Sequence, residues 1–600
     1  MLALLALLTT AQAQTLTLEG ECPGPVEITL SDLTPGGSVF VVAGDGPGAR
    51  PIPSGPCAGI STGLSAPLTP FGPIRDSDGD GVISLTPSIP APFCDLPFVA
   101  IDLASCGVSS LAAVTEPAGG FTNPPELEPD AAGVYNLSMQ PGEVEIDGQR
   151  YCVRTWNGAV PGPTLRIPAG DDRSVRVDLH NDMAGPALRE VGDAEYDFNQ
   201  TNLHTHGLHV SPERTTDDEY YADNVLIHVM AGGESNHRYD IDEDFQHYSG
   251  TFWMHPHVHG ATAIQVGSGM AGALIIEGAY DSVPGLADAT ERVMLLQHLP
   301  YRDATPLADE EECTGDNLSI DSFDVLTESS PTLLSGQLQP TLTVPGGDVE
   351  HWRFVHAGVT DVMRMSVHAA TSADCGTWAG GAGVSLRQIA ADGITLPTPF
   401  ERDDLFMAPG YRVDLAFEAP DGTGTWCLVA ERGAGPGLST ELLAVVEVDA
   451  ALVATNPSPP SDEDLAASAP PTLACEGAVD GEQSVTLDQV GLGCPPLNID
   501  CRSWEESLDD PRILPVDTVE EWTVQTGLGT HPYHIHVNPF TVCTERVDEP
   551  PAPHWRDTLL ATRDAATLRA SYDLYSGDFV QHCHKLDHED QGMMELVRIE

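Results

Sequence analysis

One short string near the C-terminus has the residue types of a redox-active metal site: His582-Cys583-His584-Lys585-Leu586-Asp587-His588. Met593 follows its last histidine by five residues. A cysteine thiolate, two imidazoles and a weak thioether are the ligands of a blue-copper electron-transfer site, whereas a zinc site does not require this combination. The string therefore predicts a copper centre, with Cys583, His588 and Met593 as three of its ligands.

The position of Cys583 between two histidines predicts a second metal centre beside the first. In a β-strand, residues i and i+2 point to one face, and residue i+1 points to the other. His582 and His584 can therefore bind one centre while Cys583 binds another. Electrons that arrive at the thiolate would then have a covalent path of one residue to the imidazoles on either side.

Other His-x-His pairs supply candidate partners for this string. They are His204/His206, His255/His257, His257/His259 and His534/His536, the last preceded by His531. With 21 His in 600 residues, chance alone gives roughly 0.7 such pairs. Five pairs are present when the pair at 582 and 584 is counted, so these histidines are expected to serve a common function.

The length and composition indicate several domains built from strands. At about 150 residues per domain, 600 residues correspond to roughly four domains. Short strand-like patches recur between turns rich in the 58 Gly and 50 Pro of the chain. We therefore expect an all-β, multi-domain protein.

The charge of the chain limits its partners. The formal net charge is −64, from 90 acidic and 26 basic residues, which argues against nucleic acid or an anionic membrane surface as a partner. Cations and neutral molecules are compatible with this charge. We interpret the acidity as an aid to solubility or an adaptation to salty surroundings. Lys585 is the single lysine of the chain, and it lies inside the string described above.

Two features predict export to the periplasm or the extracellular space. Residues 1–13 form an apolar stretch that closes on Ala11-Gln12-Ala13, the outline of a signal peptide with its cleavage signal. The chain has 13 Cys, and the 12 that remain besides Cys583 allow up to six disulfides, which form in oxidising compartments. No other segment reaches the roughly 20 apolar residues of a membrane span.

Residues 15–115 are predicted to form a small, disulfide-containing β-domain. Apolar runs alternate there with Gly/Pro turns, and histidines are few. Within this domain, residues 76–81 have the oxygen spacing of a calcium loop. Position twelve of an EF-hand loop would be Pro87 in place of glutamate, so a calcium site and a plain acidic turn are both open interpretations.

Three further β-domains are predicted from strand openings that recur on one plan. Related openings begin near residues 175, 348 and 517, which favours domains at 130–282, 285–450 and 475–600. The segment between the last two domains is rich in Pro, Ser, Ala and Asp, a composition typical of linkers.

At four places the chain resembles the three-domain multicopper oxidases, a family that includes laccases and bacterial copper-efflux oxidases. The four motifs lie in order at residues 202–207, 253–257, 531–536 and 582–594. The resemblance covers residues 130–600 and leaves the first 115 outside it. It implies three cupredoxin-like Greek-key β-barrel domains, here preceded by the small extra β-domain.

The resemblance also implies four copper ions, one of type 1, one of type 2 and two of type 3. The implied type 1 ligands are His531, Cys583, His588 and Met593. The implied type 2 ligands are His204 and His534. The implied type 3 ligands are His206, His255, His257, His536, His582 and His584. The 273 residues between His257 and His531 leave room for a middle domain without ligands.

Two acidic residues are implied to serve the copper cluster. In the copper-efflux oxidases, the acid directly after the last type 1 histidine relays protons, and this residue corresponds to Glu589. The alternative for Glu589 is that it only orients a metal ligand, which is a common role for a neighbouring carboxylate. A second acid follows the first motif, for which we choose Asp223, with Asp217 and Asp218 as alternatives.

The activity implied by the resemblance is oxidation of a small-molecule reductant by single electrons, coupled to reduction of dioxygen to water. Phenols or aromatic amines are the expected donors, and oxidation of cuprous or manganous ions is the alternative. The chain has 12 Met but lacks the methionine-rich insertion that copper-efflux oxidases typically carry, which weakens the cuprous alternative. A copper-binding electron carrier without oxidase turnover would need only the type 1 site, so the eight other histidines count against it.

Overall fold

The computed structural model describes residues 15–600 apart from a set of short segments. These segments are 21–23, 32, 36, 45–50, 53–55, 58–67, 77–82, 86–87, 90–97, 107, 109–113, 116–119, 169–173, 192–193, 216–218, 242–247, 309–310, 327–329, 373–374, 382, 434–438, 457 and 490–492. The chain divides into two compact units. The smaller unit consists of Met1–Thr122 with Thr341–Gly346 and Asp449–Thr455, and the larger unit holds the other residues.

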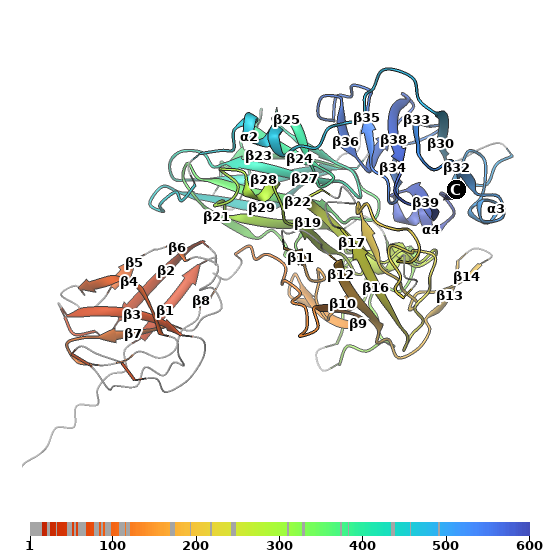
Figure 1. Cartoon of the computed structure of the whole chain (residues 1–600). Coiled ribbons are helices and arrows are strands. Elements are labelled where there is room, and N and C mark those ends of the chain that lie inside the picture. The colour runs from red at the N-terminus through yellow and green to blue at the C-terminus, as the bar shows by residue number, and fades with distance from the viewer. Residues whose placement is uncertain are drawn as a thin grey trace, which may run out of the picture. The chain divides into compact units, whose positions relative to one another are not determined.

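The smaller unit contains two β-sheets (Figure 1). The first has the order β5-β2-β1-β8, with β6 beside β2, and comprises β1 (Thr15–Gly20), β2 (Gly24–Ser31), β5 (Ile83–Leu85), β6 (Ser88–Ile89) and β8 (Val114–Thr115). The second has the order β4-β3-β7, from β3 (Ser38–Gly44), β4 (Leu68–Asp76) and β7 (Phe98–Asp102). Alternate residues such as Ile28 and Leu30 of β2 and Val39 and Val41 of β3 form one buried core, as the two-residue period of a strand requires.

Two expectations for this part of the chain concern residues that the structure does not describe. The expected signal peptide at 1–13 lies outside the described residues, and so do residues 77–81 of the expected calcium loop. No helix within the described ranges has the length and apolar character needed to cross a bilayer.

The larger unit contains three successive pairs of β-sheets. In the first pair the strand orders are β10-β9-β12-β16 and β11-β18-β17-β15. The strands are β9 (Val134–Ile146), β10 (Gln149–Trp156), β11 (Leu165–Ile167), β12 (Ser174–Asn181), β15 (His204–His206), β16 (Glu234–Asp240), β17 (Gly250–His255) and β18 (Gly272–Ile276). Val177 and Leu179 of β12 pack in one core with Phe252 of β17 and Leu274 of β18, so the two sheets face each other. A separate hairpin pairs β13 (Leu188–Val191) with β14 (Ala194–Asp197).

Within the larger unit, the middle pair has the orders β20-β19-β22-β27-β24-β25 and β29-β28-β23-β26. Its strands are β19 (Glu291–Gln297), β20 (Leu333–Leu334), β22 (Val349–His356), β23 (Met363–Ala369), β24 (Leu386–Ala391), β25 (Ile394–Arg402), β26 (Leu405–Met407), β27 (Arg412–Glu418), β28 (Gly424–Arg432) and β29 (Ser439–Asp449). The strand β21 (Thr341–Pro345) belongs to the smaller unit. None of the predicted metal ligands lies on these strands. Gly410, in the turn between β26 and β27, nevertheless approaches the histidines described below.

The last pair has the orders β31-β30-β33-β38-β35-β36 and β32-β40-β39-β34-β37. Its strands are β30 (Gly481–Asp488), β31 (Asn498–Ile499), β32 (Arg512–Leu514), β33 (Thr518–Thr526), β34 (His531–Ile535), β35 (Phe540–Val542), β36 (His554–Arg556), β37 (Thr558–Ala561), β38 (Ala566–Tyr572), β39 (Gly577–Cys583) and β40 (Met594–Ile599). Cys583 and Met593 belong to the buried core between the two sheets, together with Trp522 and Leu568. The core of this pair therefore contains two of the predicted copper ligands.

Helices are short and few in the described part of the chain. They are α1 (Thr262–Gly267), α2 (Asp462–Ser468), α3 (Trp504–Asp509) and α4 (Leu586–Asp590), with 3₁₀-helices η3 (Tyr280–Ser282) and η4 (Phe323–Val325). Ser503 and Glu506 form a capping box that satisfies the first N–H groups of α3. The predominance of strands confirms the prediction of an all-β, multi-domain chain. The domain boundaries given above stay a proposal.

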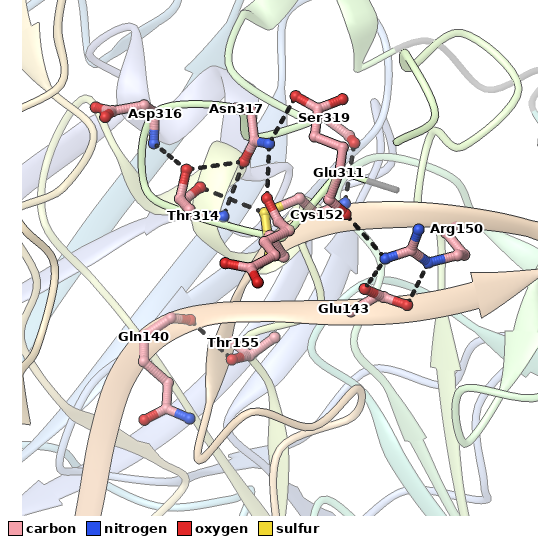
Figure 2. Close-up of a disulfide and its surroundings, with 12 residues drawn as sticks. Gln140, Glu143, Arg150, Cys152, Thr155, Glu311, Thr314, Asp316, Asn317 and Ser319 are labelled. Atoms are coloured by element: carbon pink, nitrogen blue, oxygen red, sulfur yellow. Dashed lines mark hydrogen bonds and ion pairs between the residues drawn. A yellow bond between two sulfur atoms is a disulfide. The ribbon is translucent and has the colours of Figure 1, made fainter. Parts of the chain in front are cut away.

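Five disulfides are formed by the described cysteines. They are Cys57–Cys106, Cys152–Cys313, Cys375–Cys427, Cys475–Cys543 and Cys494–Cys501. Cys583 is a free, buried thiol, as the sequence predicts for a copper ligand. Figure 2 shows the Cys152–Cys313 bridge, where the N–H of Cys152 on β10 donates to the Ser319 hydroxyl at 3.1 Å. This bridge joins the first pair of sheets to the segment between β19 and β20 of the middle pair.

Candidate metal centres

The histidines of the first two motifs are positioned by β15 and β17. These strands are antiparallel, and their register sets His204 opposite His255. The rings of these two residues meet edge to face, with centroids 5.1 Å apart. His257 lies just beyond β17, and its backbone N–H donates to the side-chain oxygen of Asn202 at 2.6 Å. This hydrogen bond fixes the second motif against the first.

The histidines of the last two motifs are positioned by β34 and β39, which lie beside α4 in the blue part of Figure 1. Their antiparallel register sets His534 opposite His582 and Tyr533 opposite Cys583. The Cys583 side chain packs in the domain core, while His582 and His584 contact histidines of the first pair of sheets. The alternation along β39 thus directs neighbouring side chains to two separate sites.

Eight imidazoles converge between the first and last pairs of sheets. They are His204, His206, His255, His257, His534, His536, His582 and His584. The Nε2 atoms of His257 and His536 each lie 3.1 Å from Nε2 of His582. Nδ1 of His206 lies 3.2 Å from Nε2 of His584. Imidazole nitrogens this close together lack space for separate hydrogen-bond partners. Their spacing suits metal ions that are each bound by more than one of these histidines.

Burial makes these imidazoles suitable metal ligands. Burial, reinforced by the neighbouring histidines, lowers the pKa of His204 and of His582 well below the ordinary value, so both rings are neutral at pH 7. Neutral imidazole is the form that binds a metal. Nε2 of His204, His255 and His534 has no hydrogen-bond partner among the described residues. A buried nitrogen without a partner is unfavourable, and a bound cation would satisfy it.

The other predicted ligands form a compact triangle on the far side of β39. Nδ1 of His531 lies 3.3 Å from Sγ of Cys583 and 3.3 Å from Nδ1 of His588. Nδ1 of His588 lies 3.7 Å from the same sulfur. Met593 is fully buried in the same core, and its carbonyl oxygen accepts the N–H of Cys583 at 3.0 Å. Two imidazoles and a thiolate in a triangle, with a methionine nearby, match the donor set of a blue-copper site.

Asp223 lies directly behind the histidine cluster. Its carboxylate is 2.9 Å from Nδ1 of His204 and accepts the N–H and hydroxyl of Thr205 at 2.8 and 3.0 Å. Burial raises the pKa of Asp223 to about 7, against the opposing effect of the Thr205 hydrogen bonds. This acid can therefore hold or release a proton near neutral pH. The alternatives Asp217 and Asp218 lie outside the described residues.

Glu589 contacts two of the cluster histidines from α4. Its carboxylate lies 3.2 Å from Nδ1 of His582 and 3.5 Å from Nδ1 of His257. The hydroxyl of Thr262 donates to Glu589 at 3.1 Å. Burial, followed by the nearby charge of Asp590, raises the pKa of Glu589 well above its usual value. The arrangement gives Glu589 both a proton to donate and a position beside the cluster.

Asp590 anchors the helix that presents Thr262. Its carboxylate accepts backbone N–H groups of Gly260 at 2.7 Å, Thr262 at 3.2 Å and Ala263 at 2.8 Å. Thr262 and Ala263 belong to the first turn of α1, whose N–H groups have no partner within the helix, and Gly260 lies just before it. Asp590 therefore holds α1 against α4, although the sequence analysis did not assign it a role.

Asp557 is a further cluster contact that the sequence analysis missed. Its carboxylate lies 3.1 Å from Nε2 of His206, and its carbonyl oxygen lies 2.9 Å from Nδ1 of His534. Arg412 of the middle pair of sheets binds the same carboxylate with two nitrogens. Asp557 follows His536 by 21 residues, and no spacing rule links the two, so the sequence carries no signal for this contact.

The middle pair of sheets also closes the cluster through Gly410. Its backbone adopts a φ of +89°, which favours glycine. A Cβ at this position would lie 2.9 Å from Cδ2 of His584 and 3.2 Å from Cε1 of His206. The close approach of this backbone therefore requires the absence of a side chain.

A pocket of about 280 Å³ opens beside His588. Its lining comes from the middle and last pairs of sheets: Thr360, Asp361, Val362, Gly433, Thr530, Lys585, Asp587 and His588. Nδ1 of His588 faces Cys583 at 3.7 Å, so the opposite edge of the ring is the one that an electron donor in the pocket can reach. The lining mixes polar and apolar atoms and has room for a small molecule.

Comparisons with known proteins agree with this geometry. Family models described as multicopper oxidase match residues 138–280 and 494–600. A laccase of Bacillus stratosphericus is 24% identical over 511 residues, covering 78% of this chain and 94% of that protein. A laccase of Bacillus subtilis is 22% identical over 533 residues, covering 78% of this chain and 94% of that protein.

Solved structures show the same fold. A laccase-like multicopper oxidase of Ochrobactrum sp. superposes with a TM-score of 0.61 at 22% identity, over 80% of this chain and 100% of that chain. A multicopper oxidase of Campylobacter jejuni, described as a metallo-oxidase, gives 0.60 at 20% identity, over 80% of this chain and 96% of that chain. These likenesses confirm the predicted cupredoxin-like fold.

The fold, the two matched models and the histidine clusters agree on one class: residues 138–280 and 494–600 match multicopper oxidase models, and the chain is similar to a laccase over 78% of its length. It is a laccase-like, copper-dependent oxidoreductase that couples one-electron oxidation of a reductant to four-electron reduction of dioxygen to water.

Proposed function

We propose that twelve side chains of this chain hold four copper ions. The type 1 ligands are His531, Cys583, His588 and Met593. The other eight histidines hold one type 2 and two type 3 ions, with His204 and His534 at the type 2 ion. The single observation that carries the proposal is the placement of Cys583, whose sulfur faces one ligand triangle while its two neighbours on the chain contact the histidine cluster.

Bound copper supplies one-electron redox chemistry at both sites. The residues of the chain do the rest: His588 presents an imidazole edge to the pocket, and Cys583 joins the two sites covalently through His582 and His584. Four donor molecules each lose one electron, and one dioxygen takes up four electrons and four protons to form two water molecules. Glu589 lies where those protons are needed.

Phenols or aromatic amines are the donors that we propose. The pocket beside His588 is of small-molecule size, and the chain is similar over most of its length to proteins named laccases. Oxidation of cuprous or manganous ions is the second candidate, favoured by Asp361 and Asp587 in the lining. Steady-state rates for a phenol, cuprous ion and manganous ion, measured side by side, would separate the two. A phenol turned over more slowly than either ion would contradict the first candidate.

We also propose that the protein is exported. The apolar N-terminal stretch is the outline of a signal peptide, and five disulfides are typical of an oxidising compartment. Fractionation of cells that express the full gene would test this, and retention of the unprocessed protein in the cytosol would contradict it.

Glu589→Gln is expected to slow dioxygen reduction about 10- to 100-fold. The amide keeps the shape of the side chain but cannot deliver a proton to the cluster. The measurement is oxygen uptake with the copper content verified. Glu520→Gln is the matched control, because Glu520 is also buried in the last pair of sheets but contacts Gln483 instead of a histidine. Unchanged turnover in fully loaded Glu589→Gln would rule out the relay.

A further inference from the structure

Lys585, the single lysine of the chain, lies beside the proposed copper ligands. It is the only lysine among 600 residues in a chain whose formal net charge is −64. The fold places it in the lining of the pocket beside His588. Its backbone N–H also donates to Sγ of Cys583 at 3.4 Å. The one amine side chain of the protein therefore lies both at the donor pocket and beside a proposed type 1 ligand.

The surrounding charges leave the ammonium of Lys585 available to the pocket. The lining contains two carboxylates, Asp361 and Asp587. Asp361 pairs at 3.0 Å with Arg432, which is itself buried. No carboxylate among the described residues lies within ion-pair distance of the Lys585 ammonium. The pocket is thus close to neutral, on a protein whose surface otherwise repels anions.

We propose that Lys585 is a specificity-determining residue that admits aromatic donors with a negative charge, such as phenols that carry a carboxylate. This inference rests on the proposed function, because it assumes that the pocket beside His588 receives the donor. Opposite charges attract at short range, so the ammonium offsets the repulsion that an anionic donor meets on approach to this acidic protein.

The same charge has a second consequence at the type 1 ligands. Lys585 is three residues from His588 in the chain and lines the same pocket, and its backbone N–H lies 3.4 Å from Sγ of Cys583. A fixed positive charge within electrostatic reach of these ligands disfavours added positive charge on the site. It should therefore favour the reduced, less positive state of the site over the oxidised one.

The test compares Lys585→Met, which removes the charge and keeps the length, with Lys585→Arg, which keeps the charge. The donors are a carboxylated phenol and its uncharged methyl ester. Lys585→Met is expected to raise KM for the acid about two- to fivefold relative to the ester, and Lys585→Arg is not. The difference should shrink as salt is added, because salt screens exposed charges.

Chemical modification provides an independent measurement, because Lys585 is the only side-chain amine. Acetylation removes its charge and reductive methylation keeps it, so only acetylation should reproduce the effect of Lys585→Met. A redox titration of the type 1 site should show its equilibrium shifted about two- to fivefold toward the oxidised state in Lys585→Met.

The outcomes distinguish this inference from the function on which it rests. Equal acid-to-ester KM ratios in wild type and in Lys585→Met, together with an unchanged type 1 equilibrium, would overturn the role of Lys585 alone. A wild-type protein that takes up copper without oxidising either donor would overturn the proposed donor site instead.

Discussion

Cys583→Ser is expected to reduce oxygen uptake more than about 100-fold. Serine cannot replace the thiolate as a copper ligand, so the type 1 copper, through which electrons enter, is lost. The eight histidines keep their three copper ions. The variant should bind about three copper ions per chain and lack the visible absorption of thiolate-bound copper. Copper analysis, the absorption spectrum and oxygen uptake measure the three effects.

The control for Cys583→Ser is a measurement that the variant still folds. Cys583 is the free cysteine of the described chain, so its replacement breaks none of the five disulfides. An unchanged circular dichroism spectrum would show that the loss is chemical. Oxygen uptake near the wild-type rate in Cys583→Ser would contradict the assignment of Cys583 as the entry ligand.

Arg412→Met is expected to lower the free energy of unfolding by about 3–5 kcal/mol. Arg412 is fully buried and binds the Asp557 carboxylate with two nitrogens, one of them at 2.9 Å. Burial opposes ionisation of Asp557, but Arg412 holds the pKa of its carboxyl well below the usual range. Without the guanidinium, the buried carboxylate beside His206 is left uncompensated. Chemical denaturation of the copper-free protein measures the effect.

Arg598→Met is the matched control for Arg412→Met. Arg598 also binds an aspartate with two nitrogens, Asp578 at 2.5 and 2.7 Å, but its side chain is 41% exposed. An exposed pair contributes no more than about 1 kcal/mol. Equal losses of stability in the two variants would contradict the importance that we assign to burial of the Arg412 pair.

The sequence predicts most of the candidate site because copper chemistry restricts both residue type and spacing. The i and i+2 positions of a strand explain why His582 and His584 lie on one side of Cys583, and His-x-His pairs identify the partner strands. Glu589 was predicted from the resemblance to copper-efflux oxidases, in which the acid directly after the last type 1 histidine relays protons. Within each motif, the residues are fixed relative to one another by local backbone geometry.

The missed residues come from segments that are adjacent only in the folded chain. Asp557 reaches His206 across 351 residues of sequence, and Arg412 reaches Asp557 from the middle pair of sheets. Gly410 matters because its backbone approaches two histidines. In the sequence it is one glycine among many, so its residue type does not mark it as part of the site. Composition singles out Lys585, but its role depends on a pocket formed by two pairs of sheets.

The most direct test of the account is copper content measured together with oxygen consumption. We expect about four copper ions per chain, and oxygen uptake in the ratio of one dioxygen to four donor electrons, with water as the product. One copper ion per chain without oxygen uptake would contradict the account. The eight converging histidines would then have only a structural role, and the protein would be an electron carrier without oxidase activity.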